Sequence, residues 1–107
     1  MKQKKVSVVI VTKDRKKDLV ECVDSYLKSS YRNLEIIIVD NASRPPLLTW
    51  FPKKYKNVKL VTSDVNLGAA EGRNRGLAET SGDYIVFTDD DAYANRDMIS
   101  QLVSVFK

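Results

Sequence analysis

The sequence predicts an α/β fold in which helices cover both faces of an open parallel sheet of about four strands. Four short segments rich in valine and isoleucine are separated by segments with helical periodicity, which is the order of a βαβ series. Three of these segments are almost continuously apolar, as strands are when a parallel sheet is covered on both faces. The length of 107 residues suits one domain, so residues 1–107 are expected to fold as a single unit.

The expected strands are residues 6–11, 34–39, 58–62 and 84–88. A helix over residues 16–29 follows from the helical spacing of its apolar residues, and a second helix is expected over residues 69–79. The connection after the second strand contains three prolines and is expected to be irregular, with one helical turn near residues 47–51. The last helix is expected to start near Arg96 after an Asn95 cap and to bury four apolar residues: Met98, Leu102, Val105 and Phe106.

The composition excludes several functional classes. The formal net charge is +4, and lysine-rich clusters at residues 2–5, 13–17 and 53–59 are interpreted as solvated surface. Nucleic-acid binding is not expected, because no nucleic-acid-binding module is recognisable. The absence of histidine and the single cysteine, Cys22, exclude a zinc site and a histidine-based triad.

The same composition bears on location. A lone cysteine fits a reducing compartment, and we expect Cys22 to be a buried, inert thiol. The longest apolar runs have four residues, whereas a membrane-spanning helix needs about 20, so no transmembrane segment is expected. The predicted location is the cytoplasm, with the membrane periphery as the alternative for a full-length parent.

Polar residues follow each expected strand. They are residues 12–15, 40–43, 64–68 and 89–91. In open parallel sheets, ligands bind outside the carboxyl ends of the strands, where the strand order reverses. A single polar turn carries no information, since aspartate, asparagine and serine favour turns in any case. Four such turns at one edge predict a binding site.

The acidic triplet, Asp89, Asp90 and Asp91, is the strongest signal at this edge. Three adjacent carboxylates repel one another, and no basic residue adjoins them in the sequence. Hard oxygen ligands suit Mg²⁺ or Mn²⁺, which can bridge to substrate phosphates. The alternative is an acidic turn that caps the last helix. For Asp40 the alternatives are a hydrogen bond to a nucleobase or ribose and an Asx-type turn, and they stay open at this point.

Three glycines recur every fourth residue in the expected second helix: Gly68, Gly72 and Gly76. We favour a packing role, in which small residues let the helix approach the sheet closely. The spacing matches neither the dinucleotide-binding nor the P-loop fingerprint. Arg73 and Arg75 cannot both face the sheet, and one of them is a candidate for contact with a phosphate or base.

The chain resembles the inverting family-2 glycosyltransferases, whose nucleotide-diphosphosugar transferase fold is called GT-A and is Rossmann-like. The resemblance rests on residues 6–15 (VSVVIVTKDR), 36–43 (IIIVDNAS), 66–77 (NLGAAEGRNRGL) and 82–91 (GDYIVFTDDD). These motifs are weak singly, but together they cover nearly the whole chain in the family's order. The resemblance implies that residues 1–107 form the N-terminal, nucleotide-sugar-binding half of such a domain, with a truncated sheet.

The resemblance also implies a role for each matched residue. Thr12 would line the nucleotide pocket and Asp40 would bind the base, usually the uracil of a UDP-sugar donor. Arg73 would lie near the base or phosphates, with Asn74 supporting that loop. Within the family's DxD motif, Asp89 would reach ribose or sugar hydroxyls and help to hold Mg²⁺ or Mn²⁺. Asp91 would be the main metal ligand and Asp90 would assist.

One departure from the family limits the expected activity. The family's general base and acceptor-binding half lie well beyond the DxD motif, and this sequence continues for only 16 residues after Asp91. No catalytic base is therefore nominated, and the acceptor is not predicted. Two alternatives remain: a non-catalytic module that self-associates through an exposed sheet edge, and a phosphoacceptor receiver domain, which the aspartates ending the fourth strand disfavour.

Overall fold

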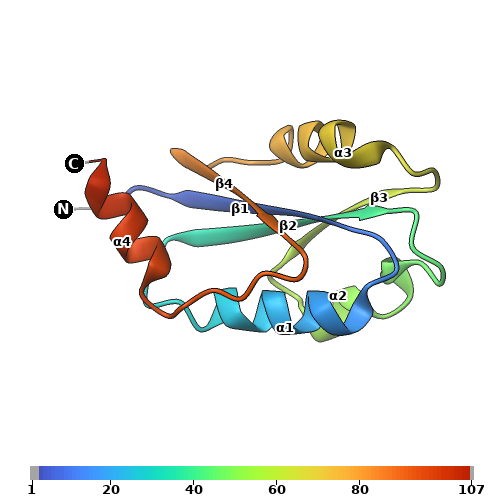
Figure 1. Ribbon diagram of the computed structural model, residues 1–107, viewed down its shortest axis with the longest axis horizontal. Coiled ribbons are helices and arrows are strands. Elements are labelled where there is room, and N and C mark those ends of the chain that lie inside the picture. The colour runs from blue at the N-terminus through green and yellow to red at the C-terminus, as the bar shows by residue number, and fades with distance from the viewer. Residues whose placement is uncertain (1–2, 107) are drawn as a thin grey trace.

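The computed structural model describes residues 3–106 and has the predicted architecture of alternating strands and helices (Figure 1). The strands are β1 (Val6–Thr12), β2 (Leu34–Asn41), β3 (Lys59–Ser63) and β4 (Tyr84–Asp89). The helices are α1 (Lys16–Leu27), α2 (Phe51–Lys54), α3 (Gly68–Leu77) and α4 (Met98–Val105). A short 3₁₀ turn, η1 (Leu47–Thr49), precedes α2 in the proline-containing connection.

The four strands form one parallel sheet in the order β3-β2-β1-β4. The chain adds β2 and β3 on one side of β1, then crosses over to add β4 on the other side. The strand order therefore reverses between β1 and β4, which makes this the switch point where ligands bind in such sheets. The register pairs Thr12 with Asp40 and Val11 with Asp89, so the carboxyl ends of three strands lie level at one edge.

The two faces of the sheet are covered unequally. Side chains alternate between faces along a strand, and Val8 and Ile10 of β1 pack in the main core with residues of α1, α2 and α4, including Val23, Phe51 and Ile99. The opposite face carries a smaller cluster of Val9, Ile37 and Val39. In Figure 1, α3 alone lies over that face. Helices on both faces confirm the predicted α/β class.

Two glycines allow α3 to lie directly on the smaller cluster. A Cβ atom added at Gly72 would lie 2.8 Å from Val11 Cγ1, and one added at Gly76 would lie 3.0 Å from Val39 Cγ2 and closer still to Val9. These distances are below van der Waals contact, which confirms the packing role for both glycines. Gly68 differs, because its φ of +79° and open surroundings make it a turn residue at the start of the helix.

The last helix is shorter and less buried than predicted. It begins at Met98 with Asp97 at the N-cap position, so the predicted Asn95 cap was wrong. The Asn95 side-chain oxygen instead accepts from the Asp97 amide in an Asx turn before the helix. Only Ile99 and Val103 are fully packed against the sheet. The prediction of burial was wrong for three residues, Leu102, Val105 and Phe106, which are 42%, 75% and 64% exposed. They are exposed because α4 contacts the sheet mainly through the narrow side that carries Ile99 and Val103.

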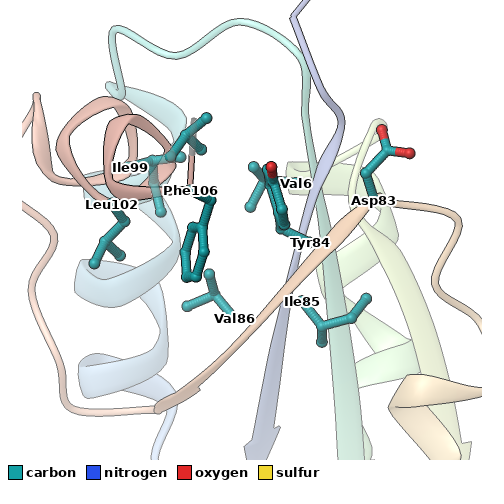
Figure 2. A pocket seen from close by; sticks show the side chains of 9 residues that line it. Val6, Asp83, Tyr84, Ile85, Val86, Ile99, Leu102 and Phe106 are labelled. Atoms are coloured by element: carbon teal, nitrogen blue, oxygen red, sulfur yellow. The ribbon is translucent and has the colours of Figure 1, made fainter.

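An apolar hollow of about 410 Å³ lies between α4 and β4 (Figure 2). The Phe106 ring stacks on Tyr84 at a centroid distance of 5.2 Å, and Val6, Val86 and Leu102 also line the hollow. Within residues 3–106, no strand pairs with the outer edge of β4. The prediction of self-association rests on an exposed sheet edge of this kind, and it remains untested.

Two further expectations concern Cys22 and the membrane. Cys22 is buried in the main core, and burial raises the pKa of its thiol to about 12, as expected for an inert thiol.

Across the part of the chain that the structure describes, none of the helices has the length and apolar character needed to cross a bilayer.

Candidate functional site

The candidate site lies at the carboxyl edge of the sheet, around the switch point between β1 and β4. Thr12 ends β1, Asp40 lies next to last in β2, and Asp89 ends β4. Asp90 and Asp91 follow in the loop after β4. The topology thus brings to one edge the residues that the sequence predicts to act together.

A buried hydrogen bond spans the switch point. The Thr12 hydroxyl donates to Asp90 Oδ2 over 2.9 Å, and the two residues are only 3% and 7% exposed. Burial raises the pKa of the Asp90 carboxyl, whereas the hydrogen bond from Thr12 and the charge of Arg15 lower it. The bond ties the loop after β4 to the end of β1 and fixes the position of the acidic triplet.

No basic residue adjoins the acidic triplet in the sequence, but in the folded chain the positive charge of Arg15 lies beside it. Its Nε lies 3.5 Å from Asp90 Oδ1, and one terminal nitrogen lies 3.5 Å from Asp91 Oδ2. The guanidinium also binds Asp18 on the first turn of α1, and this hydrogen bond is the main reason that the pKa of Arg15 is raised. Sequence reasoning missed Arg15, because the contacts join positions about 75 residues apart.

Asp40 organises a loop in this structure. It is 2% exposed, and its two carboxylate oxygens accept from the backbone amides of Ser43 and Leu47, each at 2.9 Å. This is the Asx-type alternative considered for Asp40. Its contact with a base stays a prediction.

Asn41 was not singled out from the sequence, yet it connects β2 to α3. Its side chain accepts from the Leu67 amide at 2.7 Å and donates to the Gly68 carbonyl at 3.2 Å. It thereby fixes the start of the helix that carries Arg73.

A hollow of about 210 Å³ lies at the carboxyl end of β4, lined by Arg73, Phe87, Thr88, Asp89 and Ala92. It places the Arg73 cation and the Asp89 carboxylate around one space, which suits a ligand with both phosphate and hydroxyl groups. Arg75 points elsewhere and approaches Glu71 at 3.9 Å. Asn74 is exposed and lies outside this lining.

A second hollow of about 190 Å³ lies between the loops that follow β1 and β2. Its lining includes Arg15, Lys16, Arg44 and the Trp50 ring, and Lys16 Nζ lies 4.5 Å from the centre of that ring. The Asp14 carboxylate also lines this hollow, but the three cations outnumber it, so the net charge favours an anionic ligand beside the indole. From the sequence alone Trp50 is most simply a packing residue, and no function is expected of it.

The family model for glycosyl transferase family 2 matches residues 7–107. The chain belongs to glycosyl transferase family 2. Among family relatives, glycosyltransferase GlyG of Streptococcus pneumoniae is 34% identical over 100 residues, covering 91% of this chain and 33% of GlyG. The amylovoran biosynthesis glycosyltransferase AmsB of Erwinia amylovora is 31% identical over 112 residues, covering 100% of this chain and 37% of AmsB. The chain thus spans about a third of the length of these relatives.

Solved structures have the same fold. TarS of S. aureus, in a crystal structure with UDP-GlcNAc, superimposes with a TM-score of 0.83 at 25% identity, covering 94% of this chain and 30% of that one. The mannosyltransferase PcManGT of Pyrobaculum calidifontis, in complex with GDP-Man and Mn²⁺, gives a TM-score of 0.79 at 23% identity, covering 98% and 32%. These matches confirm the predicted GT-A fold.

The acidic triplet of this family-2 domain has donors suitable for a divalent cation. Within residues 3–106, no three acidic, histidine or cysteine side chains form a ready metal cluster. Asp90 and Asp91 nevertheless both face one cation, the Arg15 guanidinium, at 3.5 Å. Mg²⁺ is commonly held by one or two carboxylates plus substrate phosphates. The two carboxylates therefore fit a cation that shares its ligands with a bound diphosphate.

We expect Asp90→Asn to stabilise the chain at pH 7 in the absence of divalent cations. Because the pKa of Asp90 is raised in the folded state, folding favours its protonated form, and the ionised form costs stability above that pKa. The variant's advantage should shrink as the pH falls through the raised pKa and vanish below about 3.9, the unfolded value. Urea unfolding at several pH values measures the difference, and an advantage that is constant from pH 7 to pH 3.5 would contradict this assignment.

Proposed function

We propose that this chain is the donor-binding part of an inverting glycosyltransferase and binds a nucleoside-diphosphate sugar, with a UDP-sugar as the first candidate. Family membership supports glycosyl transfer, and the gathering of Thr12, Asp89, Asp90 and Asp91 at the switch point supports a donor site there. The UDP-GlcNAc complex of TarS supports uridine. The single observation that carries the proposal is the convergence of these residues in a family-2 chain.

Each side chain has a proposed task in donor binding. Arg73 faces the same hollow as Asp89, which suits binding of phosphate by the cation and of sugar or ribose hydroxyls by the carboxylate. Asp91 is exposed and available to hold Mg²⁺ or Mn²⁺, with help from Asp89. When bound, the cation supplies Lewis-acid stabilisation of the leaving diphosphate. Thr12 lines the nucleotide pocket and holds the loop through its hydrogen bond to Asp90 Oδ2, which leaves Asp90 Oδ1 to assist Asp91 at the cation. Asn74 is proposed to support the Arg73 turn.

The related glycosyltransferases are about three times as long as this chain. We propose that inversion, acceptor binding and the catalytic base depend on such a longer protein. We propose residues 1–107 as the donor-binding unit of such a protein and the cytoplasm as its location. The alternative, a module that only self-associates, is less well supported, because the family match extends through the acidic triplet.

Isothermal titration calorimetry with UDP and GDP, with and without Mn²⁺, tests the proposal. We expect binding that requires Mn²⁺, with UDP favoured. The Asp91→Ala variant should lose about tenfold or more of the metal-dependent affinity, the scale typical of disturbing a metal's ligand environment. Glu21→Ala, which removes a carboxylate from the exposed surface of α1, is the control and should bind like the parent chain. Absence of binding by both nucleotides to a folded sample would refute the proposal.

A further inference from the structure

We infer that Arg15 is a built-in counter-cation, a positioning residue that holds Asp90 and Asp91 until a divalent cation takes its place. The inference rests on the proposed function, because it concerns how the donor site accepts its cation. It begins from the observation that one guanidinium lies 3.5 Å from a carboxylate oxygen of each of these two aspartates.

Arg15 and a divalent cation would compete for the same oxygens. A cation bound by Asp90 and Asp91 would lie close to the guanidinium, and two like charges at such a distance repel. Occupation by one therefore weakens occupation by the other. In the absence of nucleotide, Arg15 should lower the affinity of the acidic triplet for free metal.

Arg15 can leave the triplet without losing every partner. Its Nε and a terminal nitrogen lie 3.3 and 3.2 Å from Asp18 Oδ2, closer than their 3.5 Å distances to Asp90 and Asp91. Asp18 lies on the first turn of α1, close enough for its charge to act on Asp90, and can retain the guanidinium once the triplet is occupied. The side chain of Arg15 is also half exposed, so water can reach it during the exchange.

The exchange would couple metal binding to nucleotide binding. A diphosphate brings negative charge to the site, which offsets repulsion between the metal and Arg15 and offers the freed guanidinium a phosphate to bind in bidentate fashion. Metal alone should then bind weakly and metal with nucleotide more tightly. Arg15 would keep the acidic triplet neutralised and its loop in position in the meantime.

Titration of the metal-free 107-residue chain with Mn²⁺ alone tests this, with free Mn²⁺ measured by electron paramagnetic resonance. Arg15→Ala should bind Mn²⁺ about threefold or more tightly than the parent, since two ion pairs that oppose metal binding are lost. Arg15→Lys keeps the charge and should restore the weaker affinity of the parent. Lys13→Ala is the matched control, because Lys13 lies in the same loop but pairs with Asp14.

The outcomes separate this inference from the proposed function. If Arg15→Ala gains no more affinity than Lys13→Ala, or if no variant binds Mn²⁺ at millimolar concentration, the role of Arg15 is overturned even where the parent binds UDP with Mn²⁺. If Arg15→Ala gains affinity but the parent binds no nucleotide, the counter-cation role stands and the donor-site proposal fails. Circular dichroism confirms folding of each variant, and Arg15→Gln, which also removes the positive charge and should show the same gain in Mn²⁺ affinity, provides a second test if Arg15→Ala is unfolded.

Discussion

The Gly76→Leu variant is expected to unfold at a much lower urea concentration than the parent chain, with a loss of about 2–3 kcal/mol in the free energy of unfolding. Any Cβ atom at position 76 falls within contact distance of Val9 and Val39 at the centre of the sheet. A leucine adds three more carbon atoms, so α3 must move away from β1 and β2. The higher helix propensity of leucine offsets less than about 1 kcal/mol of this cost.

Urea unfolding followed by far-UV circular dichroism measures this effect. Glu71→Leu places the same side chain on the exposed side of α3 and is the control, since Glu71 makes only a long contact with Arg75. The control should change the unfolding free energy by no more than about 0.5 kcal/mol. Equal stability of the two variants would mean that α3 does not pack on Val9 as the structure has it.

The sheet could be predicted closely because its strands are nearly continuous apolar runs. Each observed strand lies within two residues of its predicted bounds, as for β2, which continues two residues past the predicted end at Val39. The short crossover was also predicted, because its prolines exclude a regular helix throughout. Local composition thus determines the elements, and the crossover rule supplies their parallel arrangement.

The last helix could not be predicted as well, because its sequence is apolar on almost every side. Met98, Ile99, Leu102, Val103 and Val105 offer several possible buried stripes. Periodicity cannot choose among them, and the choice of Ile99 and Val103 depends on how the helix crosses the sheet. Of the four residues predicted to be buried, Met98 packs against the core, whereas the prediction was wrong for Leu102, Val105 and Phe106.

The location of the site could be predicted from the sequence, but only some of its contacts could. The acidic triplet and Thr12 were identified because strand ends share one edge in a parallel sheet. The approach of Arg15 to Asp90 and Asp91 depends on β1 and β4 being neighbours, which sequence spacing does not reveal. The contacts of Trp50 with Lys16 and of Asn41 with Leu67 were not predicted for the same reason, since each joins segments that are distant in the sequence.

The Asp40→Ala variant is the second substitution for which we expect a large effect, a loss of about 2–5 kcal/mol in the free energy of unfolding. Removing the carboxylate leaves two buried amides, those of Ser43 and Leu47, without their acceptor oxygens. The affected loop also contributes to the hollow that contains Arg44 and Trp50. Asp64→Ala, at an exposed position after neighbouring β3, is the control and should leave stability nearly unchanged.

Asp40→Asn separates the structural role of this residue from recognition of a base. The amide keeps one acceptor oxygen and loses the other, so a loop-building Asp40 predicts a stability loss between those of the parent and Asp40→Ala. An Asp40 that also binds the base predicts weaker UDP binding in addition to this loss of stability. The carboxylate is 2% exposed, and both of its oxygens already accept hydrogen bonds from backbone amides. We therefore expect Asp40→Asn to show the intermediate loss of stability. Urea unfolding and calorimetry with UDP on the same samples measure stability and binding.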